Sequence, residues 1–181
     1  MRVTGGRWAS RRLAGPPKGV AIRPTPDALR EQAFAVLGGR LEGAAFLDLF
    51  CGTGAVSIEA LSRGAASVVL VEQARVAAEL ALRNLRTLDV PPERFELIRD
   101  DAGRAVDRLA KEGRSFPIAW CDPPFSSWVA GAAVLTRGRE AGLLPSGALV
   151  VLETPSSRVF PPRGFARVRG LRGAFLLVVE K

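Results

Sequence analysis

Residues 45–54, with the sequence AFLDLFCGTG, join a continuous apolar run to a turn with two glycines. Short apolar runs that end in turn residues are typical of strands buried on both faces of a sheet. Gly52 and Gly54 allow the chain to turn tightly and a ligand to approach the backbone. A helix is expected at 54–63, closed by Gly64, so this stretch predicts a strand, a glycine turn and a helix.

The same alternation of apolar runs and longer amphipathic stretches continues to residue 153. The expected strands are 45–50, 67–72, 95–99, 117–121 and 148–153, and the expected helices between them are 54–63, 74–88, 102–112 and 128–140. Such a βαβα series packs as an α/β, doubly wound and mostly parallel sheet. Two further β-like segments, 165–169 and 174–180, predict a closing antiparallel hairpin at the C-terminus.

The first third of the chain has a different pattern. Residues 1–23 mix Gly, Arg and Pro without sustained periodicity, which predicts an irregular basic arm. A helix is expected to follow, with a Thr25 hydroxyl as its cap and Pro26 at its first position. We therefore divide the chain into 1–42, the basic arm plus helix, and 43–181, the main domain.

Composition excludes several functional classes. The 181 residues are 48% hydrophobic and 24% charged, which are globular proportions for one domain. No apolar run approaches the ~18 residues of a membrane span, so we expect a cytoplasmic protein without a membrane partner. Histidine is absent, which excludes Ser-His and Cys-His nucleophiles and His-ligated metal sites, so no metal is expected. Tyrosine is absent as well, which excludes a tyrosine general acid. Cys51 and Cys121 are most simply buried thiols in a reducing compartment.

The net charge of +8 is concentrated at the two ends of the chain. Residues 1–30 have a net charge of +6 and residues 156–181 of +5, so the middle sums to about −3. This clustering favours contact with a polyanion, although codon bias could account for arginine in place of lysine. The candidate RNA-binding residues are Arg7, Arg11, Arg12, Arg23 and Arg30.

Carboxylates follow the first and second expected strands. Asp48 lies four residues before Gly52, and Glu72 ends the second strand, where it could bind adjacent ribose hydroxyls. The third glycine of a dinucleotide fingerprint would fall at Ser57. Asp48 would repel a pyrophosphate but suits a cationic cofactor such as S-adenosylmethionine. Alternatively, Asp48 and Glu72 are a solvated carboxylate or a helix cap.

The fourth strand continues into Asp122-Pro123-Pro124-Phe125. The prolines fix φ and remove two backbone donors, which leaves a rigid turn with accessible carbonyls. The Asp122 side chain and the Pro123 carbonyl could then both accept hydrogen bonds from one planar NH₂ group. Phe125 could stack on the base that carries this group. Alternatively, the motif is a turn that ends the strand and Phe125 belongs to the core.

In these motifs the chain resembles the RsmD-type bacterial 16S ribosomal RNA guanine-N2 methyltransferases, which have a class I, Rossmann-like methyltransferase fold. Further residues that carry the resemblance are 2–6, 11–13, 22–27, Arg30, Glu31, Phe34 and 59–65. The resemblance implies methylation of one guanine amino group (the guanine-966 type of site) of 16S rRNA, within a small-subunit ribosomal particle. The chain departs from the residue pattern of this family at Ala35, Ala74 and Arg172-Gly173.

Carried over by position, the resemblance implies roles for individual residues. The amine-binding, catalytic residues are Asp122, Pro123 and Phe125. The cofactor-binding residues are Thr25, Asp48, Cys51, Gly52, Gly54, Glu72, Gln73, Asp101 and Ala102. The Arg23-Pro24-Thr25 turn would lie beside the methionine end of the cofactor, so 1–42 would also serve as a cofactor lid. The enzyme is expected to be a monomer.

Two other functions remain open on sequence grounds. An adenine-N6 DNA methyltransferase would use the same Asp122–Phe125 motif, although such enzymes usually carry a larger target-recognition domain. A non-catalytic RNA-binding assembly factor could retain a Rossmann core. A dehydrogenase is a poor third, because it leaves the Asp122–Phe125 motif without a purpose.

Overall fold

A computed structural model describes residues 1–17, 19, 24–124, 128–154 and 160–180. The strands are β1 Ala45–Leu49, β2 Ser67–Val71, β3 Phe95–Ile98, β4 Ile118–Cys121, β5 Leu149–Glu153, β6 Phe165–Leu171 and β7 Ala174–Val179. The α-helices are α1 Asp27–Leu37, α2 Ala55–Ser62, α3 Arg75–Thr87, α4 Ala102–Lys111 and α5 Trp128–Glu140, and short 3₁₀ turns cover Gly38–Leu41 and Pro92–Arg94.

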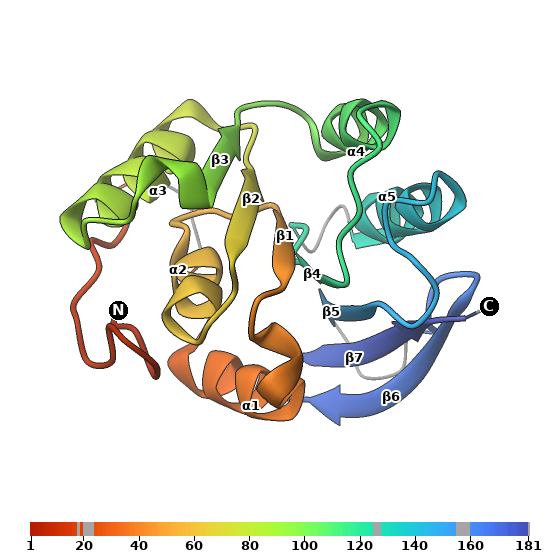
Figure 1. The fold of residues 1–181 in the computed structure, drawn as a ribbon, viewed down its shortest axis with the longest axis horizontal. Coiled ribbons are helices and arrows are strands. Elements are labelled where there is room, and N and C mark those ends of the chain that lie inside the picture. The colour runs from red at the N-terminus through yellow and green to blue at the C-terminus, as the bar shows by residue number, and fades with distance from the viewer. Residues whose placement is uncertain (18, 20–23, 125–127, 155–159, 181) are drawn as a thin grey trace.

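The strands form one sheet in the order β3-β2-β1-β4-β5-β7-β6 (Figure 1). The first five in this order pair in parallel, whereas β7 is antiparallel to β5 and β6 is antiparallel to β7. The predicted doubly wound sheet with a closing hairpin is therefore confirmed. The order reverses between β1 and β4, which is where sheets of this kind bind ligands, beyond the carboxyl ends of the strands.

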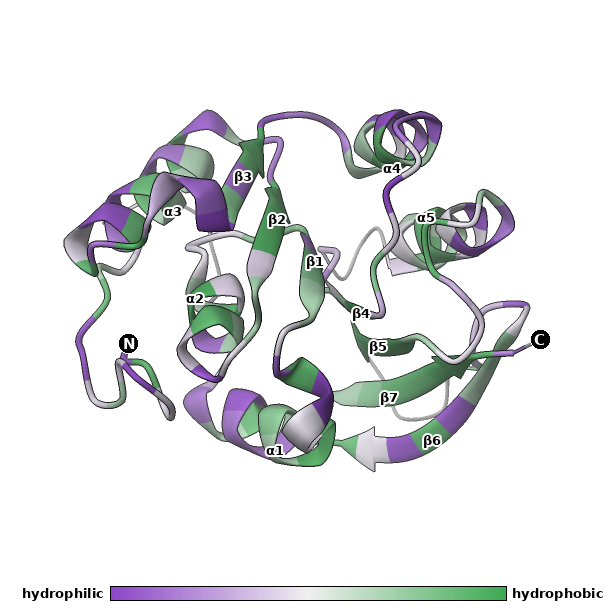
Figure 2. Ribbon diagram, in the orientation of Figure 1, coloured by the Kyte–Doolittle hydropathy of each residue, from purple (hydrophilic) through white to green (hydrophobic). Residues whose placement is uncertain are grey.

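Two apolar cores cover the two faces of the sheet. One contains residues of α1, α2 and α3, and the other contains residues of α4 and α5. The central strands have the continuous apolar sequence that burial on both faces demands, and Figure 2 shows them largely in the hydrophobic colour. In β1 the side chains of Phe46 and Leu47 belong to opposite cores, and Asp48 is the one polar side chain of the strand, buried to 1% exposure.

The described residues of the N-terminal arm are irregular, as predicted, but they pack against the domain, which the sequence did not predict. Val3, Trp8 and Leu13 are buried in the core that contains α1. Arg2 and Arg12 form an antiparallel bridge that closes the arm into a loop. The apolar residues are too widely spaced to produce a periodic pattern, so their common burial could not be seen in the sequence.

The start of α1 also differs from the prediction. The helix begins at Asp27, Pro26 occupies the cap position, and no side chain caps it. The Thr25 hydroxyl donates instead to Glu153 Oε1 at 3.1 Å, because this buried carboxylate needs donors.

In the described part of the chain, no helix combines the length and apolar character needed to cross a bilayer.

Candidate active site

The glycine turn connects β1 to α2 and has the backbone conformation that the sequence predicts. Gly52 has φ 54° and Gly54 has φ 75°, both in the left-handed region. A Cβ on Gly54 would also lie 3.0 Å from Ala81 Cβ on α3. Two requirements therefore favour glycine at position 54: the left-handed φ of the turn and the close approach of α3.

Asp48 is a buried carboxylate held by the first turn of α2. The backbone N–H and the hydroxyl of Ser57 donate to Asp48 Oδ2, at 3.2 Å and 2.6 Å. The pKa of Asp48 is raised to about 7: burial is the main cause, the negative charges of Asp122 and Glu72 add to it, and the Ser57 bonds oppose it. Among the described residues no cationic side chain lies within ion-pair distance of Asp48. A cationic ligand at this carboxylate would supply the missing countercharge.

Glu72 and Asp101 organise the loops after β2 and β3. Glu72 accepts a bond from the Gly52 N–H at 2.9 Å and another from the Ala74 N–H at 2.8 Å, one on each oxygen. Each oxygen has a second lone pair for a ligand hydroxyl. Asp101 caps α4, because its Oδ1 accepts from the N–H groups of Gly103 and Arg104. The capping role and a ligand contact through the other oxygen are compatible.

The described residues form two adjacent hollows at this edge of the sheet. The larger has a volume of about 610 Å³, within the range of small-molecule sites. It is lined by Phe50, Val71, Glu72, Gln73, Ala74, Asp100, Asp101, Ala102, Pro124, Ala130 and Val134. The smaller is lined by Pro24, Thr25, Asp48, Phe50, Cys51, Gly52, Thr53, Ala55, Val56, Trp120 and Asp122. Every predicted cofactor residue except Gly54 lines one of the two.

Phe50 lines both hollows and was not among the predicted site residues. Its φ of 67° is left-handed, a conformation that costs a bulky residue about 1–3 kcal/mol. The sequence shows Phe50 only as the last apolar residue of a strand. No sequence signal distinguishes it, because the strained turn arises from the geometry around Gly52.

The Asp122-Pro123-Pro124 corner borders both hollows, because Asp122 lines the smaller one together with Asp48 and Pro124 lines the larger one. The Asp122 N–H donates to the Leu49 carbonyl at 3.3 Å, which extends the β4–β1 pairing by one residue. Pro123 is buried and packs on Gly131 of α5, where a Cβ would lie 2.5 Å from Pro123 Cγ. Helix α5 therefore holds the corner in place. Phe125, the third predicted catalytic residue, lies outside the described residues.

Glu153 is a further site residue that the sequence did not reveal. It is 2% exposed at the carboxyl end of β5. Its Oε1 accepts from the Thr25 hydroxyl and from Trp120 Nε1 at 3.2 Å. Both donors line the smaller hollow, so Glu153 holds two of its walls. In the sequence it is only a polar residue that ends an apolar run.

The predicted RNA-binding residues separate into two groups. Arg7, Arg11 and Arg12 are exposed on the arm, as expected. Arg30 is fully buried, which contradicts its prediction as an RNA contact. Its Nη2 donates to the Arg2 carbonyl at 2.5 Å and to Asp27 Oδ1 at 2.7 Å, so it ties the arm to α1. Arg23 lies outside the described residues.

Both cysteines are free and buried, as expected. Burial raises the pKa of the Cys51 and Cys121 thiols well above the ordinary value, and nearby carboxylates raise it further. Neither thiol is therefore a nucleophile at neutral pH. Cys51 contributes only apolar surface and backbone to the smaller hollow.

Comparison with known proteins adds independent information. A family model described as conserved hypothetical protein 95 matches residues 1–170. Ribosomal RNA small subunit methyltransferase D of Escherichia coli K12 is 37% identical over 125 residues, which cover 69% of this chain and 60% of that protein. The protein of the same name from Haemophilus influenzae is 30% identical over 160 residues, which cover 87% of this chain and 80% of that protein.

Solved structures show the same fold. A hypothetical protein of Thermus thermophilus, TTHA0928, is 30% identical and superposes with a TM-score of 0.81 over 100% of this chain and 99% of that one. The protein SMU.776, solved complexed with SAH, is 16% identical and has a TM-score of 0.69 over 86% of this chain and 50% of that one. This second likeness concerns the fold alone.

Proposed function

Because this chain belongs to the conserved hypothetical protein 95 family, we propose that it is an S-adenosylmethionine-dependent methyltransferase that acts on the exocyclic N2 amino group of a guanine in 16S rRNA of the small ribosomal subunit. The observation that carries the proposal is the pair Asp48 and Asp122. Their side chains line one small hollow beside a larger cavity of cofactor size.

We assign the two hollows to the two halves of this cofactor. Asp48, buried and without a cation in ion-pair reach among the described residues, would hold the cationic methionine end. Glu72 would accept the ribose hydroxyls, and Asp101 with Ala102 would hold the adenine in the larger cavity. When bound, S-adenosylmethionine supplies a methyl group activated by a positively charged sulfur.

Asp122 and Pro123 would hold the amino group of the target base. The Asp122 carboxylate and the Pro123 carbonyl would accept its two N–H bonds, which directs the nitrogen lone pair at the methyl group. Because the nitrogen becomes cationic on methylation, its proton is then acidic enough to leave without a strong base. Most of the rate enhancement would come from orientation and from desolvated hydrogen bonds.

The choice of RNA rests on the relatives and on the charge. The relatives named above are small-subunit rRNA methyltransferases, and Arg7, Arg11 and Arg12 lie exposed on the arm. Arginine forks suit phosphate oxygens. We place the reaction in the cytoplasm, on a small-subunit particle, with the enzyme as a monomer.

The test is methyl transfer from labelled S-adenosylmethionine to three acceptors: small subunits from an E. coli strain that lacks the relative named above, naked 16S rRNA, and duplex DNA. The expected result is one N2-methylguanine in 16S rRNA of the particle, identified by mass spectrometry. Transfer to adenine in DNA would instead support an adenine-N6 DNA methyltransferase. RNA binding without any transfer would support a non-catalytic assembly factor.

A further inference from the structure

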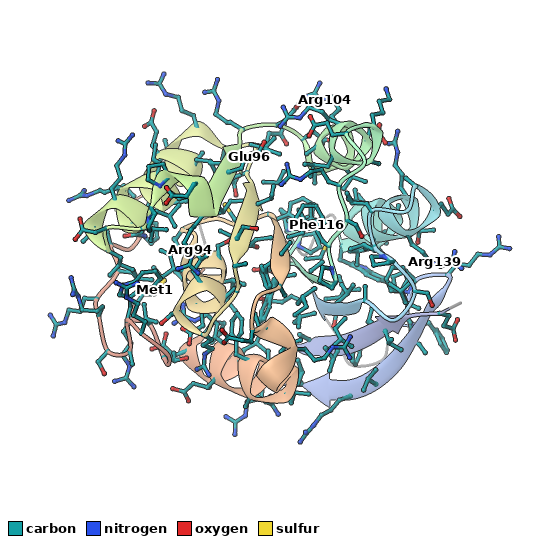
Figure 3. All side chains as sticks on the ribbon, in the orientation of Figure 1. Met1, Arg94, Glu96, Arg104, Phe116 and Arg139 are labelled. Atoms are coloured by element: carbon teal, nitrogen blue, oxygen red, sulfur yellow. The ribbon has the colours of Figure 1, made fainter. Side chains whose placement is uncertain are left out.

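The arginines of this chain fall into two groups according to their partners. On the side of β3, α4 and α5, Arg104 pairs with Asp100, Arg108 with Glu96, and Arg137 with Asp107. Figure 3 labels Arg104 and Glu96 on this side of the molecule. Further pairs are Arg75–Glu79, Arg108–Glu112, Arg114–Glu96 and Arg114–Glu112. The positive charge of these arginines is largely neutralised.

The hairpin of β6 and β7 carries two of the exposed arginines without an ion pair in the described chain, a group that also includes Arg83, Arg86 and Arg99. Arg169 in β6 and Arg172 in the turn are both exposed. Neither has an ion-pair partner within the described part of the chain. Strand β6 is also an edge of the sheet, and in Figure 2 it carries hydrophilic positions where β5 and β7 are apolar. Charged edge strands resist pairing with other strands, so this edge suits a polyanion better than another sheet.

A β-bulge determines which way Arg169 faces. Arg167 pairs with Leu177 and Arg169 with Leu176, so Val168 is the extra residue. Leu177 belongs to the core on the α4 side and Leu176 to the core that contains α1. Side chains of paired residues share a face, so the bulge turns Arg169 to the face that carries α1 and the arm.

The turn of the hairpin is bonded to the residue that follows Glu153, and Glu153 in turn holds two lining residues of the smaller hollow. The Thr154 N–H donates to the Gly173 carbonyl at 3.1 Å, one residue beyond Glu153, which holds Thr25 and Trp120. The Arg172 N–H donates to Gln32 Oε1 of α1 at 2.9 Å. In Figure 1 the tip of β6 accordingly ends beside α1.

The arm is connected to a lining residue of the same hollow, Thr53, through a different set of contacts. Asn84 of α3 bridges the two: its Oδ1 accepts from the Ala14 N–H, and its Nδ2 donates to the Thr53 carbonyl in the glycine turn. Arm and hairpin are therefore both bonded to α1, which lies between them in Figure 1, and both are connected to residues around the hollow.

We propose that Arg169 and Arg172 form a second phosphate-binding surface for the RNA substrate, across α1 from the arm. This inference rests on the proposed function and extends it: the RNA strand would be held on both sides of the base that enters the hollow. A base drawn into a pocket leaves its two flanking phosphates outside, and contacts on both sides would fix its position.

The test compares the salt dependence of binding to 16S rRNA for the intact protein and an R169Q/R172Q variant. Loss of two phosphate contacts should reduce the slope of log K against log salt by about 1.4–1.8 and weaken binding about 15- to 30-fold near 0.15 M salt. R108Q/R137Q, which removes the same charge from the opposite face, should leave the slope unchanged. R169K/R172K should restore the slope, because lysine keeps the positive charge. If the glutamine variant only had a folding defect, restoring the charge would not be expected to restore the slope.

The outcomes separate the two claims. If the wild-type protein methylates 16S rRNA but the glutamine variant keeps the wild-type slope, the hairpin surface is wrong and the proposed function stands. If both double variants reduce the slope equally, the effect is net charge and the surface is also wrong. If the wild type binds no rRNA, or the hairpin affects only duplex DNA binding, both claims fail.

Discussion

Replacing Asp48 by Asn should stabilise the fold and weaken cofactor binding. Asparagine keeps the shape of the side chain and an oxygen that can accept from Ser57. It removes a charge that lies in the core with 1% exposure. The stabilisation arises because the wild-type protein must ionise this buried group above neutral pH.

The size of the effect follows from the pKa. Burial raises the pKa of Asp48 from 3.8 to about 7, so between these pH values the folded protein holds a proton that the unfolded chain has lost. Wild-type stability therefore falls as the pH rises through this window. The shift of about 3 pH units corresponds to an upper bound of about 4 kcal/mol, present in full above pH 7.

Urea unfolding at about pH 8 and about pH 5 measures this directly. D48N should be more stable than the wild type at the higher pH by up to about 4 kcal/mol, and the difference should shrink as the pH falls. Calorimetry should show S-adenosylmethionine binding about 10- to 100-fold weaker in D48N, the loss expected for a charged hydrogen-bonding group. A variant that is less stable than the wild type at pH 8 would refute the account of a strained buried charge.

Two further substitutions test how the site is held. In G131A the new Cβ would lie 2.5 Å from Pro123 Cγ and would displace the Asp122-Pro123 corner. Methyl transfer should fall about 10- to 100-fold, while S-adenosylmethionine affinity measured by calorimetry stays within about 2-fold. An equal loss of both would show that Pro123 does not act on the target base. The buried Glu59 carboxylate accepts hydrogen bonds from Thr4 and Arg63, and E59Q removes its charge. This substitution should lower the free energy of unfolding by about 3 kcal/mol and make the arm susceptible to limited proteolysis. An arm as resistant as that of the wild type would contradict the contact.

The sheet could be predicted from the sequence because its signals are local. Each parallel strand is a short, mostly apolar run followed by a turn, and the strand boundaries agree with the predictions to within one or two residues. Gly52 and Gly54 marked the turn, and Asp48 near the end of β1 and Glu72 directly after β2 marked the ligand edge. Because these patterns are local, eight of the nine predicted cofactor residues line the two hollows, although other lining residues, such as Phe50, were not predicted.

The failures involve contacts between residues far apart in the chain. Arg30 is one more arginine in a basic segment of the sequence, yet it is buried, and its Nη2 donates to the Arg2 carbonyl and to Asp27. Trp8 of the arm is buried, and its backbone N–H donates a hydrogen bond to the Ser62 hydroxyl at the end of α2. Glu153 became part of the site only through Trp120 and Thr25. No periodicity within a segment reports such pairings.

The most direct test of the central claim is D122A, assayed for both methyl transfer and cofactor binding. Asp122 is proposed to hold the target amine, whereas Asp48 and Glu72 are proposed to hold S-adenosylmethionine. D122A should therefore lose methyl transfer to 16S rRNA while its affinity for S-adenosylmethionine stays within a few-fold of the wild type. Full activity in D122A, or loss of cofactor binding together with activity, would contradict the assignment.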